Sequence, residues 1–309
     1  MPPKRNWRDG LRSLFPDAKF DEPLKKYTTF KIGGPADAFV VAKTLDDLVR
    51  LFGFARSRRL PVFLIGWGSN LLVLDGGIRG VVLQLKGDFD RVEFFGEGCV
   101  RAGAAVRLPN LVLRCAQRGL AGSEPLVGVP GTVGGALVMN AGTRDGEIGD
   151  LVRSIEYFDP ETLSVRRLTR SRIRFQYRRS SLGGKFLVST ELELKAGDKV
   201  DIIGRVKKYQ QIRLKTQPVH SYNVGSTFKN PPGLFVARLI EEAGLKGTEF
   251  GGARVSLKHA NFFENDRRAT ASDVLGLVDL VRREILERRG VKLELEMKVV
   301  GEPAEAAAR

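Results

Sequence analysis

Hydrophobic positions in the first part of the chain alternate between a helical spacing and a strand spacing. After Thr44, which forms a capping-box pattern with Asp47, apolar residues recur at helical intervals and predict a helix that ends before Leu60. The apolar run 62–65 predicts a buried strand, and a second strand is expected over 81–85. Helices that alternate with strands indicate an α/β arrangement in this region.

Beyond Gly87 the hydrophobic pattern changes to short strands with few helices between them. Strands are expected at 91–95, 99–102, 154–158, 164–168 and 186–194, and a helix at 108–117. This pattern predicts a second, strand-rich domain. A helix over 198–213 then leads into the last part of the chain.

The last part of the chain is expected to be a third domain with a long amphipathic helix. Apolar residues at helical spacing predict that helix over 273–289, with Ser272 as its N-cap and Gly290 as its left-handed C-terminal stop. The other expected elements are a helix at 235–243, a strand at Val255 and a final strand over 292–300.

These changes of pattern divide the chain into consecutive segments. We expect a basic N-terminal extension at 1–20, three domains at 21–86, 87–212 and 213–301, and a tail at 302–309. A chain of 309 residues with 42% hydrophobic side chains is long enough to form several buried cores.

The chain is strongly basic, with 51 Lys and Arg against 36 Asp and Glu and a formal net charge of +15. Such an excess attracts anions, and nucleic acid is the first partner to consider. The basic residues are scattered over different elements, however, and the sequence has no nucleic-acid-binding motif. We therefore expect a solvated basic surface that steers an anionic small molecule, and no nucleic-acid partner.

Membrane insertion, secretion and metal binding are not expected from the sequence. No run has the length of an apolar transmembrane helix, and the polar start of the chain lacks a signal-peptide pattern, so the expected location is the cytoplasm. Cys99 and Cys115 are expected to be reduced thiols. Together with His220 and His259 they match no familiar zinc spacing, so no metal site is expected.

The segment 128–142, GVPGTVGGALVMNAG, combines five glycines with apolar anchors. Because glycine lacks a Cβ and permits positive φ, a ligand can approach such a backbone closely, and successive amides can hold an anion. A helix that begins after the turn would add its dipole. A tight turn between core elements explains the same residues without a ligand, so this segment alone leaves both interpretations open.

A second glycine turn, GWGSN at 66–70, directly follows the expected strand 62–65. A strand that ends on glycines, a hydroxyl and an amide is suited to holding a pyrophosphate. The turn is not the Rossmann fingerprint, because Leu71 stands where the third glycine is required. Two separate glycine turns favour a long ligand held at two points, such as a dinucleotide.

Three further polar segments are candidates for chemistry. GSTFKNP at 225–231 places a hydroxyl after a glycine, FQYRRS at 175–180 carries adjacent arginines, and LELE at 293–296 places two carboxylates on one face of a strand. Each also has an ordinary structural explanation, as a turn, a solvated charge run and an amphipathic edge strand respectively.

Taken together, these segments closely resemble the motif set of the UDP-N-acetylenolpyruvoylglucosamine reductase family. In chain order the motifs are YTTFKIGG at 27–34, GWGSNLL at 66–72, PGTVGGA at 130–136, MNAG at 139–142, YRRS at 177–180, GSTFKNP at 225–231, KHANF at 258–262 and LELE at 293–296. No single motif is specific, but their joint occurrence in this order is. The resemblance extends from about Asp21 to Gly301.

The resemblance implies an α+β fold with three domains. Two α+β subdomains, at 21–86 and 87–212, would bind FAD in the manner of vanillyl-alcohol-oxidase/PCMH flavoproteins, and a C-terminal α+β domain at 213–301 would bind the substrate. The implied reaction is reduction of UDP-N-acetylglucosamine enolpyruvate to UDP-N-acetylmuramate for peptidoglycan synthesis, with noncovalent FAD and with NADPH as reductant. Separately from the resemblance, we expect a monomer, although no motif in the sequence specifies the oligomeric state. The alternatives are another flavin-dependent oxidase or dehydrogenase of the same fold, and a non-catalytic nucleotide-sugar or nucleic-acid binder.

The matching positions also imply the residues of the site. Those implied around the flavin pyrophosphate are Gly66, Trp67, Gly68, Ser69, Asn70, Leu71, Pro130, Gly131, Thr132, Val133, Gly134, Gly135, Asn140, Ala141 and Gly142. Ser226 is the implied proton donor, Arg178 the implied partner of the substrate carboxylate, and Glu296 the implied stabiliser of the charge that develops there. The implied substrate-binding residues are Asn230, Lys215 and Tyr177.

The sequence departs from the family pattern at three points. Some members carry an insertion whose tyrosine covers the diphosphate, and the stretch between Arg178 and Ser226 is too short for it, so the chain matches the shorter class. Thr216 stands where the family has a lysine before Gln-Pro, and Lys215 is the nearest substitute. Arg179, beside Arg178, is a second candidate for the carboxylate partner.

Overall fold

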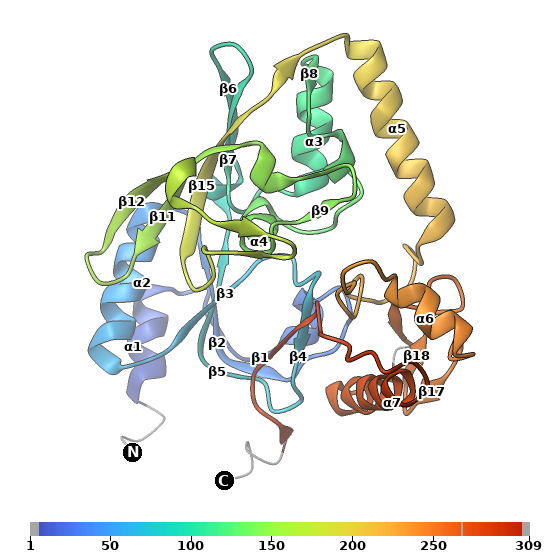
Figure 1. Cartoon of the computed structure of the whole chain (residues 1–309). Helices are drawn as coiled ribbons and strands as arrows, with labels where there is room; N and C mark the ends of the chain where they lie inside the picture. Colours follow the sequence, from blue (N-terminus) through green and yellow to red (C-terminus); the bar gives the residue numbers. More distant parts are fainter. Residues whose placement is uncertain (1–5, 267, 305–309) are drawn as a thin grey trace. The chain divides into compact units, whose positions relative to one another are not determined.

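The computed structural model describes residues 6–266 and 268–304 (Figure 1). The chain forms two compact units, and each combines separate stretches of sequence. Unit 1 consists of Met1–Phe20, Ala38–Gly66 and Gly80–Ile212, and unit 2 consists of Asp21–Asp37, Trp67–Arg79 and Arg213–Arg309. The sequence predicts consecutive domains, whereas these units interleave; the expected boundaries after residues 20 and 212 coincide with unit boundaries.

The chain passes between the units along strands of a four-stranded sheet. The strands lie in the order β1 (Lys19–Pro23), β2 (Pro35–Ala42), β5 (Ile78–Leu85) and β3 (Val62–Ile65), with β3 parallel to β5. Strands β2 and β5 each begin in unit 2 and end in unit 1. A hydrophobic pattern predicts each strand as a single element. It therefore cannot show that the boundary between two units lies within a strand.

Two helices of unit 1, α1 (Asn6–Leu14) and α2 (Leu45–Arg58), run side by side (Figure 1). The predicted capping box of α2 is confirmed, since the Thr44 hydroxyl accepts from the backbone of Asp47 and the Asp47 carboxylate accepts from the backbone of Thr44. Helix α1 lies in the stretch 1–20, which the sequence predicts to be a basic extension without a helix. Leu11 and Phe15 are buried in the core of unit 1, so the described part of this stretch is packed into that unit.

The rest of unit 1 is built on an antiparallel five-stranded sheet. Its strands lie in the order β12 (Ser164–Thr169), β11 (Val152–Asp159), β15 (Phe186–Glu193), β7 (Cys99–Gly103) and β6 (Val92–Phe95). The helices of this part are α3 (Leu108–Gln117), α4 (Val133–Met139) and α5 (Lys199–Thr216). The short strand pairs are β8 (Leu120–Ala121) with β16 (Lys195–Ala196), β9 (Gly142–Thr143) with β10 (Gly146–Glu147), and β13 (Phe175–Gln176) with β14 (Arg179–Ser180). The expected strands and the expected helices at 108–117 and 198–213 are confirmed.

Unit 2 has its own hydrophobic core, formed with two helices and two small sheets. The helices are α6 (Val236–Glu242) and α7 (Ala271–Arg289), the parallel pair is β4 (Leu71–Val73) with β20 (Lys298–Val300), and the three-stranded sheet is β17 (Glu249–Phe250), β18 (Ala253–Val255) and β19 (Phe263–Asn265). Both predicted helices are confirmed, and Gly290 ends α7 with a left-handed backbone (φ +65°).

Three expectations in this part of the chain need correction. Thr270, not Ser272, is the N-cap of α7, because the Thr270 hydroxyl accepts from the backbone of Asp273. The final strand covers only Lys298–Val300. The residues just before it make a few separate backbone hydrogen bonds with 227–229 and do not form a strand ladder. The expected tail is fixed at Glu302, whose backbone exchanges hydrogen bonds with residues 76–77, and 305–309 lie outside the described residues.

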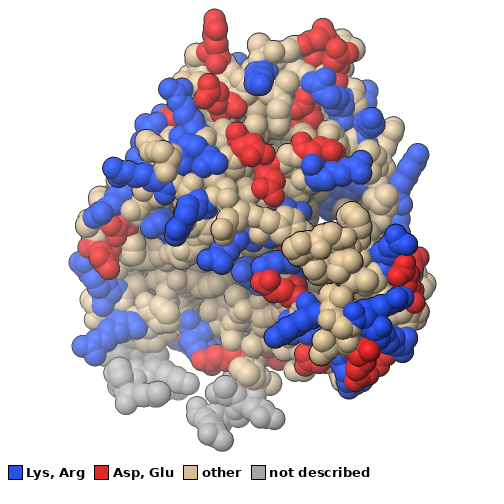
Figure 2. All heavy atoms as spheres, viewed as in Figure 1, with Lys and Arg blue, Asp and Glu red and all other residues tan. Residues whose placement is uncertain are grey.

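Basic and acidic side chains are intermixed on the face that Figure 2 shows, without a continuous field of one sign. This agrees with the scattered basic residues of the sequence. In the described part of the chain no helix is long and apolar enough to cross a membrane. The same residues contain no group of three or more His, Cys, Asp or Glu side chains arranged to hold a metal ion.

Candidate active site

The glycine-rich segment 128–142 forms the start of α4 and the turn after it. Thr132 caps α4, and its Oγ1 accepts a hydrogen bond from the third amide of the helix (3.3 Å). The N–H groups of Val133 and Gly134 donate to backbone oxygens of 104–106, at 2.8 and 2.9 Å. The first three amides of α4 are therefore used within unit 1, and an anion at this turn would be held by other groups.

Gly66, at the end of β3, meets this segment within unit 1. A Cβ atom added to Gly66 would lie 2.6 Å from Oγ1 of Thr132, so a side chain here would displace the threonine. Gln84 donates from Nε2 to the carbonyl oxygen of Gly66 (3.4 Å). The two glycine turns of the sequence thus approach each other at Gly66 and Thr132, as expected if both serve one ligand.

The rest of the second glycine turn, from Trp67 on, belongs to unit 2. Gly68 has φ +61°, and an added Cβ would collide with the carbonyl oxygen of Tyr27, so glycine is required here. Among the described residues, the N–H groups of Gly68 and Asn70 have no acceptor. Amide donors left on a tight turn suit a phosphate oxygen, so these residues fit the diphosphate of FAD. The side chain of Asn70 is used elsewhere, because its Nδ2 donates to the carbonyl oxygen of Glu296 (3.1 Å).

The structure distinguishes the two adjacent arginines of the β13–β14 hairpin, of which Arg178 lies in the turn and Arg179 begins β14. The side chain of Arg178 is only 18% exposed, and its Nη2 donates to the carbonyl oxygen of Gly142 (2.9 Å). The ring of Tyr177 lies against the guanidinium, with 4.8 Å between Cζ and the ring centroid. Arg179 is exposed. Arg178 is therefore the arginine that unit 1 holds in a defined position.

Asn140, expected near the cofactor, has its side chain used inside unit 1, where only 1% of the residue is exposed. Its Oδ1 accepts from the N–H of Gly149 (3.1 Å), and its Nδ2 donates to the carbonyl oxygen of Gln176 (3.1 Å) and to the carboxylate of Glu147 (2.5 Å). Glu147 also lies 3.7 Å from Nη1 of Arg178. Glu147 could not be found from the sequence, because it stands outside every recognised motif and its contact with Arg178 depends on the fold.

In unit 2, the segment that carries Ser226 lies beside the segment that carries Glu296. The N–H of Glu296 donates to the carbonyl oxygen of Thr227 (2.9 Å), and the N–H of Lys229 donates to the carbonyl oxygen of Glu294 (2.9 Å). Ser226 and Glu296 are both partly exposed. The structure therefore brings together two predicted catalytic residues that are far apart in the sequence.

On its other side, the Ser226 segment is held by Asn261, a buried residue of the KHANF motif. Asn261 accepts at Oδ1 from the N–H of Phe228 (3.0 Å) and donates from Nδ2 to the carbonyl oxygen of Phe228 (2.8 Å). Its backbone oxygen also accepts from the N–H of Thr227 (2.8 Å). The motif was recognised from the sequence, but this supporting role of its asparagine requires the tertiary structure.

The predicted substrate residues of unit 2 lie at helix ends. Asn230 is exposed, and its Oδ1 accepts from the N–H of Val236, the first residue of α6 (3.0 Å). Lys215 is exposed in the last turn of α5. Next to it, the ammonium of Lys258 donates to the carbonyl oxygen of Leu214 (2.6 Å). A second lysine therefore lies close to the predicted one.

His259, Cys115 and Cys99 are all wholly or partly buried, which makes them poor attachment points for a covalent flavin. Burial lowers the pKa of His259, so its imidazole is neutral near pH 7, and its ring packs edge-on against Phe262 at 4.7 Å. Burial raises the pKa of Cys115 to about 12, which keeps its thiol protonated and unreactive. Cys99 is also buried.

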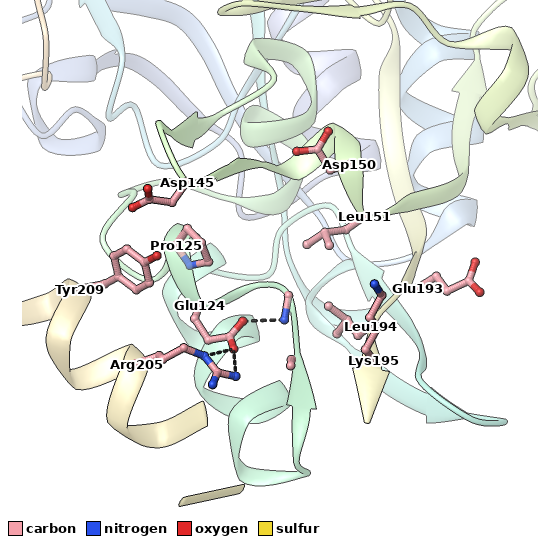
Figure 3. Close-up of a pocket in the computed structure, with 12 residues that line it drawn as sticks. Glu124, Pro125, Asp145, Asp150, Leu151, Glu193, Leu194, Lys195, Arg205 and Tyr209 are labelled. Carbon is pink, nitrogen blue, oxygen red and sulfur yellow. Dashed lines mark hydrogen bonds and ion pairs between the residues drawn. The ribbon is translucent and has the colours of Figure 1, made fainter. Parts of the chain in front are cut away.

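Unit 1 also contains a cavity of about 490 Å³ that includes none of the predicted site residues (Figure 3). Carboxylates outnumber cations in its lining, which includes Glu124, Asp145, Asp150 and Glu193 against Lys195 and Arg205. Glu124 is itself paired with Arg205 at 2.7 Å. This electrostatic balance disfavours a diphosphate, so the cavity is not the expected nucleotide site.

Comparison with known proteins agrees with the geometry of both units. A sequence model described as "FAD binding domain" matches residues 36–166, and one described as "UDP-N-acetylenolpyruvoylglucosamine reductase, C-terminal domain" matches residues 217–300. The α+β fold, with a PCMH-type FAD-binding domain and this C-terminal domain, defines an FAD-dependent oxidoreductase. The chain belongs to the UDP-N-acetylenolpyruvoylglucosamine reductase family.

The related proteins match over nearly their whole length. A UDP-N-acetylenolpyruvoylglucosamine reductase 2 of Symbiobacterium thermophilum is 43% identical, covering 95% of this chain and 96% of the relative. The corresponding reductase of Rubrobacter xylanophilus is 43% identical over 96% of this chain and 99% of the relative. The crystal structure of the Thermus caldophilus reductase superposes with a TM-score of 0.79 at 38% identity, covering 92% of this chain and 98% of that one.

Proposed function

We propose that the chain reduces UDP-N-acetylglucosamine enolpyruvate to UDP-N-acetylmuramate in peptidoglycan synthesis, with NADPH as reductant. Family membership supports the reaction, and the observation that carries the residue roles is the pairing of 226–229 with 294–297 in unit 2. This pairing places a hydroxyl and a carboxylate on neighbouring segments, as a proton-transfer site requires. We propose further that the enzyme acts as a monomer in the cytoplasm, where its nucleotide substrates are made.

The proposed cofactor contacts come from the two glycine turns, and FAD is proposed to bind without a covalent bond. In unit 2, the amides of Gly68 and Asn70 would take phosphate oxygens. In unit 1, the lack of a side chain at Gly66 permits its close approach to Thr132. The other implied residues of 66–71, 130–135 and 140–142 would line this region. When bound, FAD supplies the hydride that NADPH delivers to it, and the vinyl carbon of the enolpyruvyl group receives that hydride.

Arg178 is proposed to bind the carboxylate of the enolpyruvyl group. Its guanidinium is permanently charged and planar, so two N–H groups can face the two carboxylate oxygens at once. Its anchored side chain supports this role, because a guanidinium already fixed by Gly142 and Tyr177 loses less freedom when the substrate arrives.

Ser226 and Glu296 are proposed to handle the charge and the proton after hydride addition. Negative charge then develops toward the substrate carboxylate, and Glu296, when protonated, would donate a hydrogen bond to it. Ser226 would donate the proton to the adjacent carbon. Asn230, Lys215 and Tyr177 would contact the rest of the substrate, and Lys258, bonded beside Lys215, extends the positive charge available for the diphosphate.

The reaction is tested by NADPH oxidation with purified, FAD-loaded protein in the presence and absence of UDP-N-acetylglucosamine enolpyruvate. We expect oxidation to depend on that substrate. Flavin reduction by NADPH without any response to the substrate would instead favour another oxidase or dehydrogenase of this fold. Failure to bind added FAD would contradict the proposal at its base.

The role of Ser226 is tested by Ser226→Ala in rapid-mixing experiments on the two half-reactions. Reduction of the flavin by NADPH should stay within about twofold of the wild-type rate, while reoxidation by the enolpyruvyl substrate should slow by about 100-fold or more, because only the second step needs the proton. Ser57→Ala, in which the lost hydroxyl lies on an exposed turn of α2, is the control. Wild-type reoxidation in Ser226→Ala would exclude this serine as the donor.

A further inference from the structure

We propose that Glu147 is a positioning residue for Arg178. In this role its carboxylate, together with the carbonyl group opposite it in the β9–β10 hairpin, sets the orientation in which the guanidinium meets the substrate carboxylate. The inference rests on the proposed function of Arg178 and adds a residue that none of the motifs contains. It is carried by contacts that all lie within unit 1.

The β9–β10 hairpin contacts both terminal nitrogens of Arg178. Gly142 and Glu147 stand directly opposite each other in the hairpin register. The carbonyl oxygen of Gly142 accepts from Nη2 at 2.9 Å, and Oε1 of Glu147 lies 3.7 Å from Nη1. The Gly142 carbonyl holds one terminal nitrogen by a hydrogen bond, and the Glu147 carboxylate attracts the other at ion-pair distance. Together they favour one rotation of the guanidinium about its long axis.

Glu147 is itself held in place by the backbone and by Asn140. Its N–H donates to the carboxylate of Asp150 (3.0 Å), within a reciprocal capping box at the turn that follows β10. Its second carboxylate oxygen accepts from Nδ2 of Asn140 (2.5 Å), which also donates to the carbonyl oxygen of Gln176 in β13. Asn140 thereby ties the hairpin that carries Glu147 to the hairpin that carries Arg178.

The planar face of the Arg178 guanidinium also has a contact, in addition to the contacts of its terminal nitrogens. The ring of Tyr177 lies against it, and the Arg178 backbone has φ +53°, a left-handed conformation that few residues other than glycine adopt. An unrestrained arginine side chain samples many rotamers. Much of this freedom is already removed before substrate binds, so the guanidinium is preorganised for a planar partner.

The charge of Glu147 matters because its two oxygens have different partners. A carboxylate presents one oxygen to Asn140 and the other to Arg178. A glutamine keeps the size of the side chain but has a single carbonyl oxygen, so either Asn140 or Arg178 would face an NH₂ group. Asn140 donates a hydrogen bond here and Nη1 of Arg178 lies at an ion-pair distance, so Glu147→Gln should either release Asn140 or remove the charge that faces Arg178.

The test compares Glu147→Gln, Glu147→Asp, Arg178→Lys and the double variant Glu147→Gln/Arg178→Lys as FAD-loaded enzymes. In Glu147→Gln, NADPH-driven flavin reduction should stay within about twofold of wild type, while kcat/KM for the enolpyruvyl substrate falls by about tenfold to 100-fold. The Kd of that substrate for the oxidised enzyme, measured by calorimetry, should rise. Glu147→Asp should recover part of both losses, because it restores the charge.

The double variant separates positioning from an independent effect. If Glu147 acts through Arg178, Glu147→Gln should have little further effect in the Arg178→Lys background, whereas additive losses would overturn the inference. Wild-type kinetics in Glu147→Gln alongside impaired Arg178→Lys would overturn it too. Wild-type reoxidation in Arg178→Lys would instead remove the proposed role of Arg178, and this inference with it.

Two measurements exclude a general loss of structure. Thermal unfolding should show Glu147→Gln folded at the assay temperature, and Glu97→Gln, at an exposed turn between β6 and β7, should match wild type in both half-reactions. Equal slowing of both half-reactions in Glu147→Gln would indicate damage to the fold and overturn the positioning role.

Discussion

The segment that carries Ser226 gives neighbouring side chains very different surroundings. Ser226 is partly exposed, whereas Thr227 is completely buried and its hydroxyl has no hydrogen-bond partner among the described residues. Successive residues of an extended segment point to opposite sides, so the sequence Ser-Thr places one hydroxyl toward the site and the other toward the core. A buried hydroxyl without a partner costs about 1–3 kcal/mol.

This contrast predicts that Thr227→Val leaves the free energy of unfolding unchanged or raises it by about 1 kcal/mol, since valine removes an unpaired hydroxyl at nearly constant shape. Urea unfolding measures the effect. Thr190→Val is the matched control, because the Thr190 hydroxyl is also buried but donates to the carbonyl oxygen of Ser154 (2.9 Å) and its loss should cost about 1 kcal/mol. A larger loss in Thr227→Val than in Thr190→Val would show that the Thr227 hydroxyl has a partner.

At the scale of elements, the start of α7 depends on a residue far away in sequence. Besides its own capping box, the helix receives the carboxylate of Asp75, which accepts from the N–H groups of Ala271 (2.8 Å) and Ser272 (3.0 Å). The Ser272 hydroxyl also donates to it (2.9 Å). A negative charge at the N-terminus interacts favourably with the positive end of the helix dipole. Asp75 therefore stabilises the helix that supplies much of the unit 2 core.

Asp75→Asn should therefore lower the free energy of unfolding by about 1–2 kcal/mol, because the amide keeps one acceptor but turns donors toward the helix amides and loses the charge. Far-UV circular dichroism during urea unfolding measures this. Asp279→Asn, on the same helix with a side chain 77% exposed, should change stability by less than about 0.5 kcal/mol. Equal effects of the two variants would contradict the capping role.

Across the whole molecule, carboxylates that stabilise each unit depend on staying ionised. In unit 1, partial burial of Glu191 raises its pKa, but hydrogen bonds from Arg101 and Ser154 and the charge of Arg167 outweigh this and lower it overall. In unit 2, the backbone N–H of Thr270 lowers the pKa of Asp273 at the start of α7. Both units should therefore lose stability in acid, although the chain carries an excess of basic groups.

The pH dependence can be assigned with Glu191→Gln. A lowered pKa in the folded state means that the carboxylate stabilises the protein fully above the pKa of the unfolded chain, about 4.3, and that this contribution disappears as pH falls through the lower, folded pKa. Glu191→Gln should cost about 1–3 kcal/mol near neutral pH, and the difference from wild type should shrink below about pH 4. Glu193→Gln, exposed on the same strand, is the control. A difference that stays constant with pH would contradict the assignment.

Local sequence patterns predicted most helices and strands because each depends on neighbouring residues. The spacing of apolar residues and the Thr44–Asp47 pair were enough for α2. Such patterns do not predict α1, because its burial depends on α2 and the adjoining core. They also predict too long a last strand, because the alternation of apolar and charged residues at 292–297 reflects contacts with 227–229 rather than a sheet. Residue type alone does not locate the start of α7, because the predicted cap Ser272 and the observed cap Thr270 both belong to the residue types that cap helices.

The amino-acid sequence was sufficient to establish the family of this protein, the types of most of its secondary-structure elements and the chemical identity of its candidate catalytic groups. These follow from residue types and their order, which are fixed by the chain. The fold was needed to establish that Asn140 and Asn70 use their side chains to hold other segments, that Arg178 rather than Arg179 is held in place, and that Glu147 contacts Arg178. Such roles depend on distances between residues that are remote in sequence. Which hydrogen bonds a side chain makes is known only when its neighbours in space are known.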